Sequence, residues 1–173
     1  VLRCGALARL LGAAFQAFQI GDRKIKDFHA QNRVMTLEEV YLHSSNIGTS
    51  QLAVQMGPNT MRDYFRRLGL LDAAKIELKE SAKPVVPRRW DNSTLASLSF
   101  GYGIMITPAQ MVQAMGALTN GGRMIPLSLR KGGARNVQPQ QVVTEETSRA
   151  ILDLLRRNVV KGSGGFADAP GLR

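Results

Sequence analysis

Residues 36–56, TLEEVYLHSSNIGTSQLAVQM, constrain the fold of this chain more than any other stretch. Thr36 and Glu39 form a capping box, in which the threonine hydroxyl accepts from the N–H of Glu39 and the glutamate reaches back to the first turn. A helix is therefore predicted to begin at Thr36. Its apolar residues recur at helical spacing as far as residues 43–46, a polar run that favours helix ends over helix interiors. The first helix is expected to stop there.

A second helix is predicted directly after this polar run. Asn46 is a favourable N-cap residue, and Gly57-Pro58 is a typical signal for the end of a helix. Ser44, Ser45 and Asn46 would then lie in an elbow between two buried helices. The expected apolar face of the second helix consists of Ile47, Leu52, Val54 and Met56.

The elbow allows two interpretations. Polar caps at a corner between helices are common and need have no function. Alternatively, a rigid elbow holds the Ser44 hydroxyl and the Asn46 carboxamide so that both point into a cleft. The hydroxyl would pass protons there and the amide would orient a substrate. Such a pair is half of a serine acyl-transfer site.

The rest of the chain consists mainly of helices and turns. Residues 18–27 alternate apolar and polar around Gly21-Asp22, which predicts a hairpin. His29 is expected to tether the loop that follows by hydrogen bonding. The remaining predicted elements are helices that begin at Asn59, Thr107-Pro108 and Thr144, an irregular surface excursion over 73–91, and a strand over 123–129.

Two segments of the chain together resemble motifs of the penicillin-binding proteins. Ser44-x-Asn46, followed by I-G-x-x-x-L-A, is similar to the second motif of the division-type class B transpeptidases. Residues 99–111, SFGYGIMITPAQM, resemble the family's S-F-G-Y-G-x-x-x-T-P-x-Q-x segment. Residues 18–29 are similar to the hairpin and the Asp-aromatic-His run that precede the second motif. The chain is thus identified as a member of this family over residues 18–173.

The resemblance implies an α/β penicillin-binding fold, of which this chain would hold a mostly helical part with an incomplete central sheet. Residues 18–173 would be a partial transpeptidase domain. Residues 1–17 are rich in Ala, Leu, Gly and Arg and do not fit the family pattern. They are expected to be an unmatched amino-terminal stretch at a fragment boundary.

The resemblance also assigns roles to individual residues. Ser44 would relay protons and Asn46 would bind the substrate amide as the catalytic pair. Ser45, Gly101 and Tyr102 would belong to the substrate-binding surface. Tyr102 either forms a wall of the cleft or packs under its own loop. Neither a metal nor a cofactor is expected, and one cysteine with two histidines makes a poor metal site.

The family's other two motifs have no credible match. The only S-x-x-K is Ser128 to Lys131, which follows the second motif, whereas the nucleophile of the family precedes it and opens a buried helix. Lys161-Gly162-Ser163 has the wrong order for K-[ST]-G. We expect the nucleophile, its lysine partner and the K-[ST]-G strand to lie outside this sequence, and the fragment to be inactive alone.

For the parent protein, the resemblance implies cross-linking of peptidoglycan by serine acyl transfer from D-Ala-D-Ala stem peptides, with β-lactams as mimics of the stem. The expected partners are the stem peptide, β-lactams, a cell-division glycosyltransferase and other divisome proteins. The expected location is the periplasmic face of the bacterial inner membrane, with an anchor outside this chain. No uncharged apolar run is long enough to span a membrane.

The formal net charge of +10 keeps other classes of protein open. One alternative is a basic helical module that binds nucleic acid or an acidic partner. The lysines and arginines are scattered in pairs, with no stripe and no interleaved aromatics, so a solvated basic surface is favoured and no nucleic acid is expected. A further alternative is a β-lactam-sensing homologue without catalysis.

Overall fold

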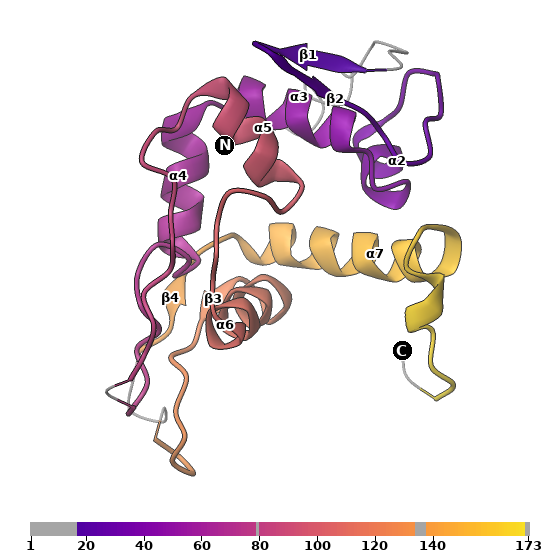
Figure 1. Ribbon diagram of the computed structural model, residues 1–173. Coiled ribbons are helices and arrows are strands. Elements are labelled where there is room, and N and C mark those ends of the chain that lie inside the picture. Colours follow the sequence, from indigo (N-terminus) through magenta and orange to yellow (C-terminus); the bar gives the residue numbers. More distant parts are fainter. Residues whose placement is uncertain (1–16, 79, 134–137, 172–173) are drawn as a thin grey trace. The chain divides into compact units, whose positions relative to one another are not determined.

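The computed structural model describes residues 17–171, apart from residues 79 and 134–137 (Figure 1). The predicted unmatched stretch, residues 1–17, therefore lies outside the described residues except for Ala17. The chain divides into two compact units, which are described separately. Unit 1 comprises residues up to 58, 89–102 and 153 onward, and unit 2 comprises 59–88 and 103–152.

Unit 1 begins with the predicted hairpin. Strand β1 (Phe18–Ile20) pairs antiparallel with β2 (Arg23–Ile25), and Phe18 lies opposite Ile25. The two-residue turn requires a left-handed backbone, which Gly21 adopts at a φ of +52°. The hairpin prediction is confirmed.

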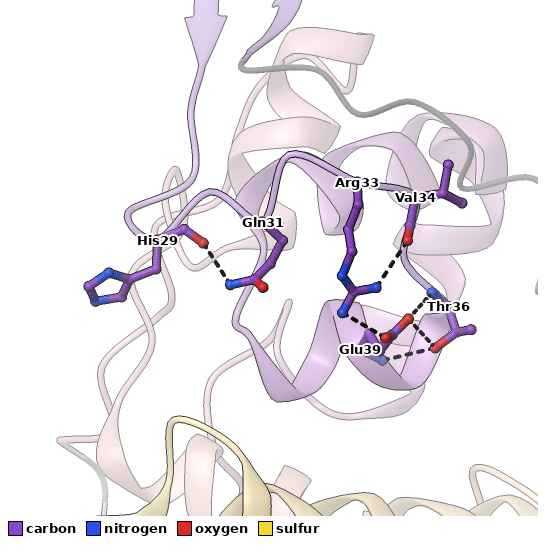
Figure 2. Close-up of polar contacts among 6 residues, drawn as sticks. All are labelled: His29, Gln31, Arg33, Val34, Thr36 and Glu39. Atoms are coloured by element: carbon purple, nitrogen blue, oxygen red, sulfur yellow. Dashed lines mark hydrogen bonds and ion pairs between the residues drawn. The ribbon is translucent and has the colours of Figure 1, made fainter.

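Helix α2 (Leu37–Leu42) begins with the predicted capping box. Thr36 Oγ1 accepts from the N–H of Glu39 at 3.2 Å, and the N–H of Thr36 donates to Glu39 Oε2 at 2.8 Å (Figure 2). Arg33 Nη2 lies 2.8 Å from the other carboxylate oxygen of Glu39. The capping box and the ion pair together fix the entry into α2, so the prediction of a helix start at Thr36 is confirmed.

The loop before α2 differs from its prediction in one detail. Gln31 Nε2 donates to the backbone carbonyl of His29 at 3.4 Å (Figure 2). The imidazole of His29 lies edge-on to Phe28, with 4.8 Å between the ring centroids. The predicted tether therefore involves the backbone of His29, because its ring is turned toward the neighbouring aromatic.

Helix α3 (Asn46–Met56) begins one residue earlier than predicted. Its N-cap is Ser45 and not Asn46, because Ser45 has an extended backbone and its Oγ accepts from the N–H of Gly48 at 3.0 Å. Asn46 is the first helical residue, and its amide is free to bond elsewhere. The helix ends as predicted at Gly57, which has a φ of +79°.

The predicted apolar face of α3 is partly wrong. Ile47 is buried, but Met56 is 41% exposed, and the other buried positions of α3 are the small residues Gly48, Ser50 and Ala53. Small side chains allow close packing against α5 (Asn92–Ser99), a helix that the sequence pattern did not single out. Figure 1 shows the two helices adjacent, and Ser50 Oγ donates to the carbonyl of Ala96 at 3.4 Å.

The end of helix α7 (Glu145–Lys161) and the short 3-10 helix η1 (Gly165–Ala167) complete unit 1. Asn158 Nδ2 donates to the carbonyl of Tyr41 at 3.3 Å, and the N–H of Ser163 donates to the carbonyl of Leu42 at 3.0 Å. The second bond satisfies the carbonyl of Leu42 at the end of α2, and the first gives a further donor to the carbonyl of Tyr41, which also accepts from the N–H of Ser44. The turn after α7 thereby fastens to the helix that leads into the elbow.

Unit 2 contains helices α4 (Pro58–Arg67) and α6 (Pro108–Thr119). Asn59 is inside α4 and does not cap it, since Pro58 has the fixed φ that suits a first helical residue. Helix α6 begins at Thr107-Pro108 as predicted, and Thr107 and Gln110 form a second capping box that the sequence analysis did not predict. Gln110 is fully buried and donates to the carbonyl of Asp72 at 2.7 Å, which secures the loop after α4.

The strands of unit 2 are shorter than predicted. Strand β3 covers only Arg123–Met124 and pairs antiparallel with β4 (Gln140–Gln141), so the strand predicted over 123–129 ends early. Because β4 has only two residues, β3 has no partner with which to form a longer ladder. The excursion over 73–91 is irregular as predicted, and a bridge between Val85 and Met105 is its one described ladder contact.

Candidate functional site

The elbow between α2 and α3 is a Schellman motif. The N–H of Ser45 donates to the carbonyl of Val40 at 2.9 Å, and the N–H of Ser44 donates to the carbonyl of Tyr41 at 3.2 Å. Ser44 has a φ of +52°, at the position where such motifs usually carry glycine. A side chain in this left-handed conformation is strained. The sequence therefore retains a hydroxyl at a backbone position that favours glycine.

The Ser44 side chain is exposed, and within the described residues its hydroxyl has no protein hydrogen-bond partner. Backbone bonds fix the main chain of Ser44, and its exposed hydroxyl is available to a ligand. The proton-relay role of Ser44 stays a prediction.

Asp27, the residue two positions after β2, clamps the elbow. Its Oδ2 accepts from Ser45 Oγ at 2.8 Å, and its Oδ1 accepts from the N–H of Ile47 at 2.9 Å. The second bond satisfies an N–H of the first turn of α3, where a negative charge is also favoured by the helix dipole. The sequence pattern did not single out Asp27 alone, although it lies in the Asp-aromatic-His run.

Ser45 is buried in the elbow. It is 2% exposed, and its hydroxyl donates to Asp27 and accepts from the N–H of Gly48. These bonds hold the elbow together. The substrate-binding role of Ser45 stays a prediction.

Asn46 lines a cavity of about 480 Å³. It is half-buried, and its Nδ2 donates to the backbone carbonyl of Lys26 at 3.2 Å, which leaves the carboxamide oxygen as an acceptor. The cavity lies among the hairpin, the start of α3, α5 and the loop after α5. Asn46 is thus the residue of the triplet that lines a space large enough for part of a ligand.

The loop after α5 supplies the aromatic part of the cavity. Tyr102 is 67% exposed, lines the cavity, and lies edge-on to Phe100 with 5.5 Å between the ring centroids. Tyr102 is therefore not enclosed beneath its own loop, and its role as a wall of the substrate cleft stays a prediction. Gly101 does not line the cavity, but its φ of +91° allows the backbone to turn and the N–H of Tyr102 to reach the carbonyl of Ser97 at 3.0 Å.

The structure thus brings together some of the predicted site residues and separates others. Asn46 and Tyr102 share the cavity. Ser44, Ser45 and Gly101 do not line it. Ser44 is next to Ser45 in the elbow and exposes its side chain to solvent, so the triplet presents the hydroxyl and the carboxamide but encloses the middle residue.

The S-x-x-K match at Ser128 has a structural role within unit 2. Ser128 Oγ donates to a carboxylate oxygen of Glu77 at 2.5 Å, and the N–H of Leu129 donates to the other oxygen at 3.0 Å. The hydrogen bond from Ser128, followed by that from Leu129, lowers the pKa of Glu77 to about 2. The match opens no helix, which agrees with its interpretation as accidental.

Two kinds of feature are absent from the described residues. No group of three or more His, Cys, Asp or Glu side chains in that part of the chain is placed to hold a metal ion. No described helix combines the length and the apolar character needed to cross a bilayer.

The helical elbow presents S-x-N, and the end of α5 and the loop after it carry S-F-G-Y-G, the two segments on which the resemblance to the penicillin-binding proteins rests. Residues 13–173 match the model of the penicillin binding protein transpeptidase domain. The chain belongs to this family.

Two curated relatives show the extent of the similarity. The chain is 49% identical over 164 residues to the "Probable peptidoglycan D,D-transpeptidase FtsI" of Caulobacter vibrioides (strain NA1000 / CB15N), covering 92% of this chain and 28% of the relative. It is 31% identical over 154 residues to the "Peptidoglycan D,D-transpeptidase FtsI" of Escherichia coli (strain K12), covering 88% of this chain and 26% of that protein. The chain therefore spans about a quarter of the length of these relatives.

A solved structure confirms the predicted fold. The apo structure of the TP domain from Burkholderia pseudomallei penicillin-binding protein 3 superposes with a TM-score of 0.80 at 27% sequence identity. The match covers 91% of this chain and 48% of that one. The described elements are accordingly a mostly helical portion of the penicillin-binding α/β fold, with two small two-stranded sheets.

Proposed function

We propose that this chain supplies the second-motif side of the active site of a peptidoglycan D,D-transpeptidase. The observation that carries the proposal is the elbow, which exposes the Ser44 hydroxyl and places Asn46 in the lining of the cavity. The 49% identity to a relative named as a probable D,D-transpeptidase supports the same reaction.

The reaction has two acyl transfers. A serine attacks the carbonyl between the two D-alanines of a stem peptide, the C–N bond breaks, and the terminal D-alanine leaves as its amine with the proton of the serine. An amine of a neighbouring stem then attacks the serine ester, and the serine recovers its proton. We expect this nucleophile, its lysine partner and the K-[ST]-G strand to be contributed by residues outside the sequence described.

Within this scheme, each residue around the elbow has its own role. The Ser44 hydroxyl passes a proton between the activating base and the leaving or entering amine. The carboxamide of Asn46 accepts from or donates to the substrate amide and fixes its orientation. Tyr102 forms a wall beside this position. Asp27 contributes by holding Ser45, and hence its two neighbours, in place.

The similarity to proteins named FtsI supports a role in division rather than elongation. The partners that follow from the proposal are the stem peptide, β-lactams, a cell-division glycosyltransferase and other divisome proteins. The corresponding location is the periplasmic face of the inner membrane, with an anchor contributed by residues outside this sequence.

The test is labelling with a fluorescent penicillin. We would compare this chain with an extended form, continued at both ends from the surrounding coding sequence, each with and without Ser44→Ala. Labelling of the extended form alone, weakened by Ser44→Ala, is the expected result. A folded extended form that no penicillin labels would overturn the transpeptidase proposal and favour a basic binding module or a non-catalytic homologue.

A further inference from the structure

The end of α7 and the turn after it bond to the two carbonyls that lead into the elbow. Asn158 Nδ2 donates to the carbonyl of Tyr41 at 3.3 Å. The N–H of Ser163 donates to the carbonyl of Leu42 at 3.0 Å. These carbonyls belong to consecutive peptide groups, each of which is planar. Both planes are therefore held by α7 and its turn, from outside the helix that carries them.

The carbonyl of Tyr41 also supports the turn at Ser44. It accepts from the N–H of Ser44 at 3.2 Å, and its two lone pairs allow it to serve Asn158 at the same time. Ser44 has a φ of +52°, a conformation that a serine keeps only where the surrounding structure imposes it. Rotation of Ser44 into the right-handed region would turn its hydroxyl in another direction. The bond from Asn158 opposes this rotation, because it holds the carbonyl to which Ser44 is bonded.

Two glycines in the turn after α7 make room for this contact. A Cβ on Gly164 would overlap Asn158 Oδ1. A Cβ on Gly162 would lie 2.8 Å from the carbonyl oxygen of Leu42 and 3.0 Å from Asn158 Nδ2. Neither glycine has a positive φ, so the backbone conformation does not itself require glycine at these positions. The space that a side chain would need is occupied by Asn158 and by the carbonyl of Leu42.

An ion pair also joins α7 to α2, but it does not act on the turn. Arg157 Nη1 lies 3.0 Å from Glu38 Oε1, and Arg157 Nε lies 2.8 Å from Asp153 Oδ2 within its own helix. All three side chains are exposed, and ion pairs of this kind contribute little to stability. The carboxylate of Glu38 contacts neither of the two carbonyls. It therefore offers a control for the contact that Asn158 makes.

We propose that Asn158 is a positioning residue for Ser44. Its carboxamide holds the carbonyl of Tyr41 and, through it, the left-handed turn that directs the Ser44 hydroxyl. The proposal rests on the proposed function, because Asn158 acts through the proton relay that Ser44 is proposed to provide. Asn158 touches no reacting atom in this scheme. Its loss should therefore slow the acyl-transfer step and leave the binding of the ligand unchanged.

The test is the rate at which a fluorescent penicillin acylates the extended form, measured over a range of penicillin concentrations. Asn158→Ala should lower the limiting rate about three- to tenfold, as expected for the loss of one hydrogen bond. The half-saturating concentration should not change. In a Ser44→Ala background the same substitution should have no further effect, because the hydroxyl that it positions is absent. Equal losses in the two backgrounds would overturn the proposal, since a general loss of structure does not depend on that hydroxyl.

Gly164→Ala displaces the Asn158 side chain without changing its chemistry. The added Cβ overlaps Asn158 Oδ1, so this variant should slow acylation as Asn158→Ala does. The double variant should be no slower than either single one. Gly165→Ala is the matched control, because a Cβ there meets only the carbonyl oxygen of Val159, at 3.7 Å, within a 4 Å radius. Acylation of Gly164→Ala at the wild-type rate would contradict the positioning role.

Glu38→Gln is the second control. It removes the ion pair between the same two helices and should leave the acylation rate unchanged. Labelling of the wild type separates the two proposals. If the wild type is labelled and Asn158→Ala is acylated just as fast, the positioning role fails and the transpeptidase proposal stands. A folded wild-type extended form that is not labelled overturns the proposed function, and the positioning role with it.

Discussion

Asp27 and Ser45 are joined by a hydrogen bond of 2.8 Å that ties the end of the hairpin to the first turn of α3. The same carboxylate accepts from the N–H of Ile47 at 2.9 Å. Ser45 is 2% exposed and Asp27 is half-buried, so removing the carboxylate leaves the Ser45 hydroxyl and the N–H of Ile47 without these protein acceptors in a largely enclosed place. The clamp therefore maintains the elbow from outside the two helices that form it.

Asp27→Ala should lower the free energy of unfolding of the extended form by about 1–3 kcal/mol, the cost of leaving buried polar groups without partners. Urea denaturation would measure it. Asp22→Ala, at the exposed hairpin turn, is the control and should stay within about 0.5 kcal/mol of wild type. An unchanged urea midpoint for Asp27→Ala would show that the clamp does not hold the elbow.

Ser44→Gly should stabilise the protein and impair it at the same time. Glycine removes the strain of a left-handed serine, which is worth about 1 kcal/mol. The loss of the hydroxyl should weaken penicillin labelling of the extended form. Ser44→Ala keeps the strain and should weaken labelling with no gain in the melting temperature. Full labelling of both variants would rule out a proton relay at Ser44.

Gly48 and Gly116 offer a matched pair of helix glycines. A Cβ on Gly48 would lie 2.5 Å and 2.7 Å from the two methyl carbons of Val40, whereas a Cβ on Gly116 would meet nothing within 4 Å. Gly48→Ala should therefore destabilise by about 1–3 kcal/mol through overpacking. Gly116→Ala should stabilise by about 0.5–1 kcal/mol through helix propensity.

The double variant Gly48→Ala/Val40→Ala separates overpacking from other causes. The methyl groups of Val40 are the atoms that a Cβ on Gly48 would meet. Removing them should therefore recover part of the unfolding free energy that Gly48→Ala loses. Thermal unfolding of the four proteins in this cycle measures the coupling. Strictly additive losses would contradict a direct clash between the two side chains.

Glu39 should make stability depend on pH in the acid range. The hydrogen bond from Arg33 and then the backbone bond from Thr36 lower the pKa of Glu39 from 4.5 to about 2. A carboxylate whose pKa is lower in the folded state stabilises the protein above its unfolded pKa. The advantage of wild type over Glu39→Gln should thus be present above pH 4.5 and disappear as the pH falls toward 2.

Arg33→Gln gives a graded check of this assignment. It removes the first cause of the shift and leaves the two bonds with Thr36, so the pKa of Glu39 should rise but stay below 4.5 (Figure 2). Carboxyl NMR titration of Glu39 in both proteins measures the change. The same titration midpoint in the two proteins would show that the ion pair does not control this carboxylate.

Local signals in the sequence predicted the elements whose ends are closed by nearby side chains. The capping box at Thr36 and the helix start at Thr107-Pro108 depend only on residues within three positions, and both are present as predicted. The hairpin turn at Gly21 and the end of α3 at Gly57 likewise follow from the conformational freedom of glycine. Each of these features is fixed within one turn of the chain.

Features that depend on distant residues were not predicted. Ser45 and not Asn46 is the N-cap, and Ser45 also donates a hydrogen bond to Asp27, which lies 18 positions earlier in the chain. The buried face of α3 is made of small residues because α5 packs closely against it, and hydrophobicity alone does not reveal that contact. The cavity combines the hairpin, α3 and α5, so no single segment could indicate it.

The fastening of α7 to α2 determines when the elbow can be completed during synthesis. The carbonyl of Tyr41 and the carboxylate of Glu38 bond to Asn158 and Arg157, which are synthesised 117 and 119 residues later. At the usual pace of a bacterial ribosome, that interval lasts on the order of 10 seconds. For that time the end of α2 lacks the bonds that Asn158 and Ser163 donate to the carbonyls of Tyr41 and Leu42, so the strained turn at Ser44 acquires its full support only after translation has passed α7.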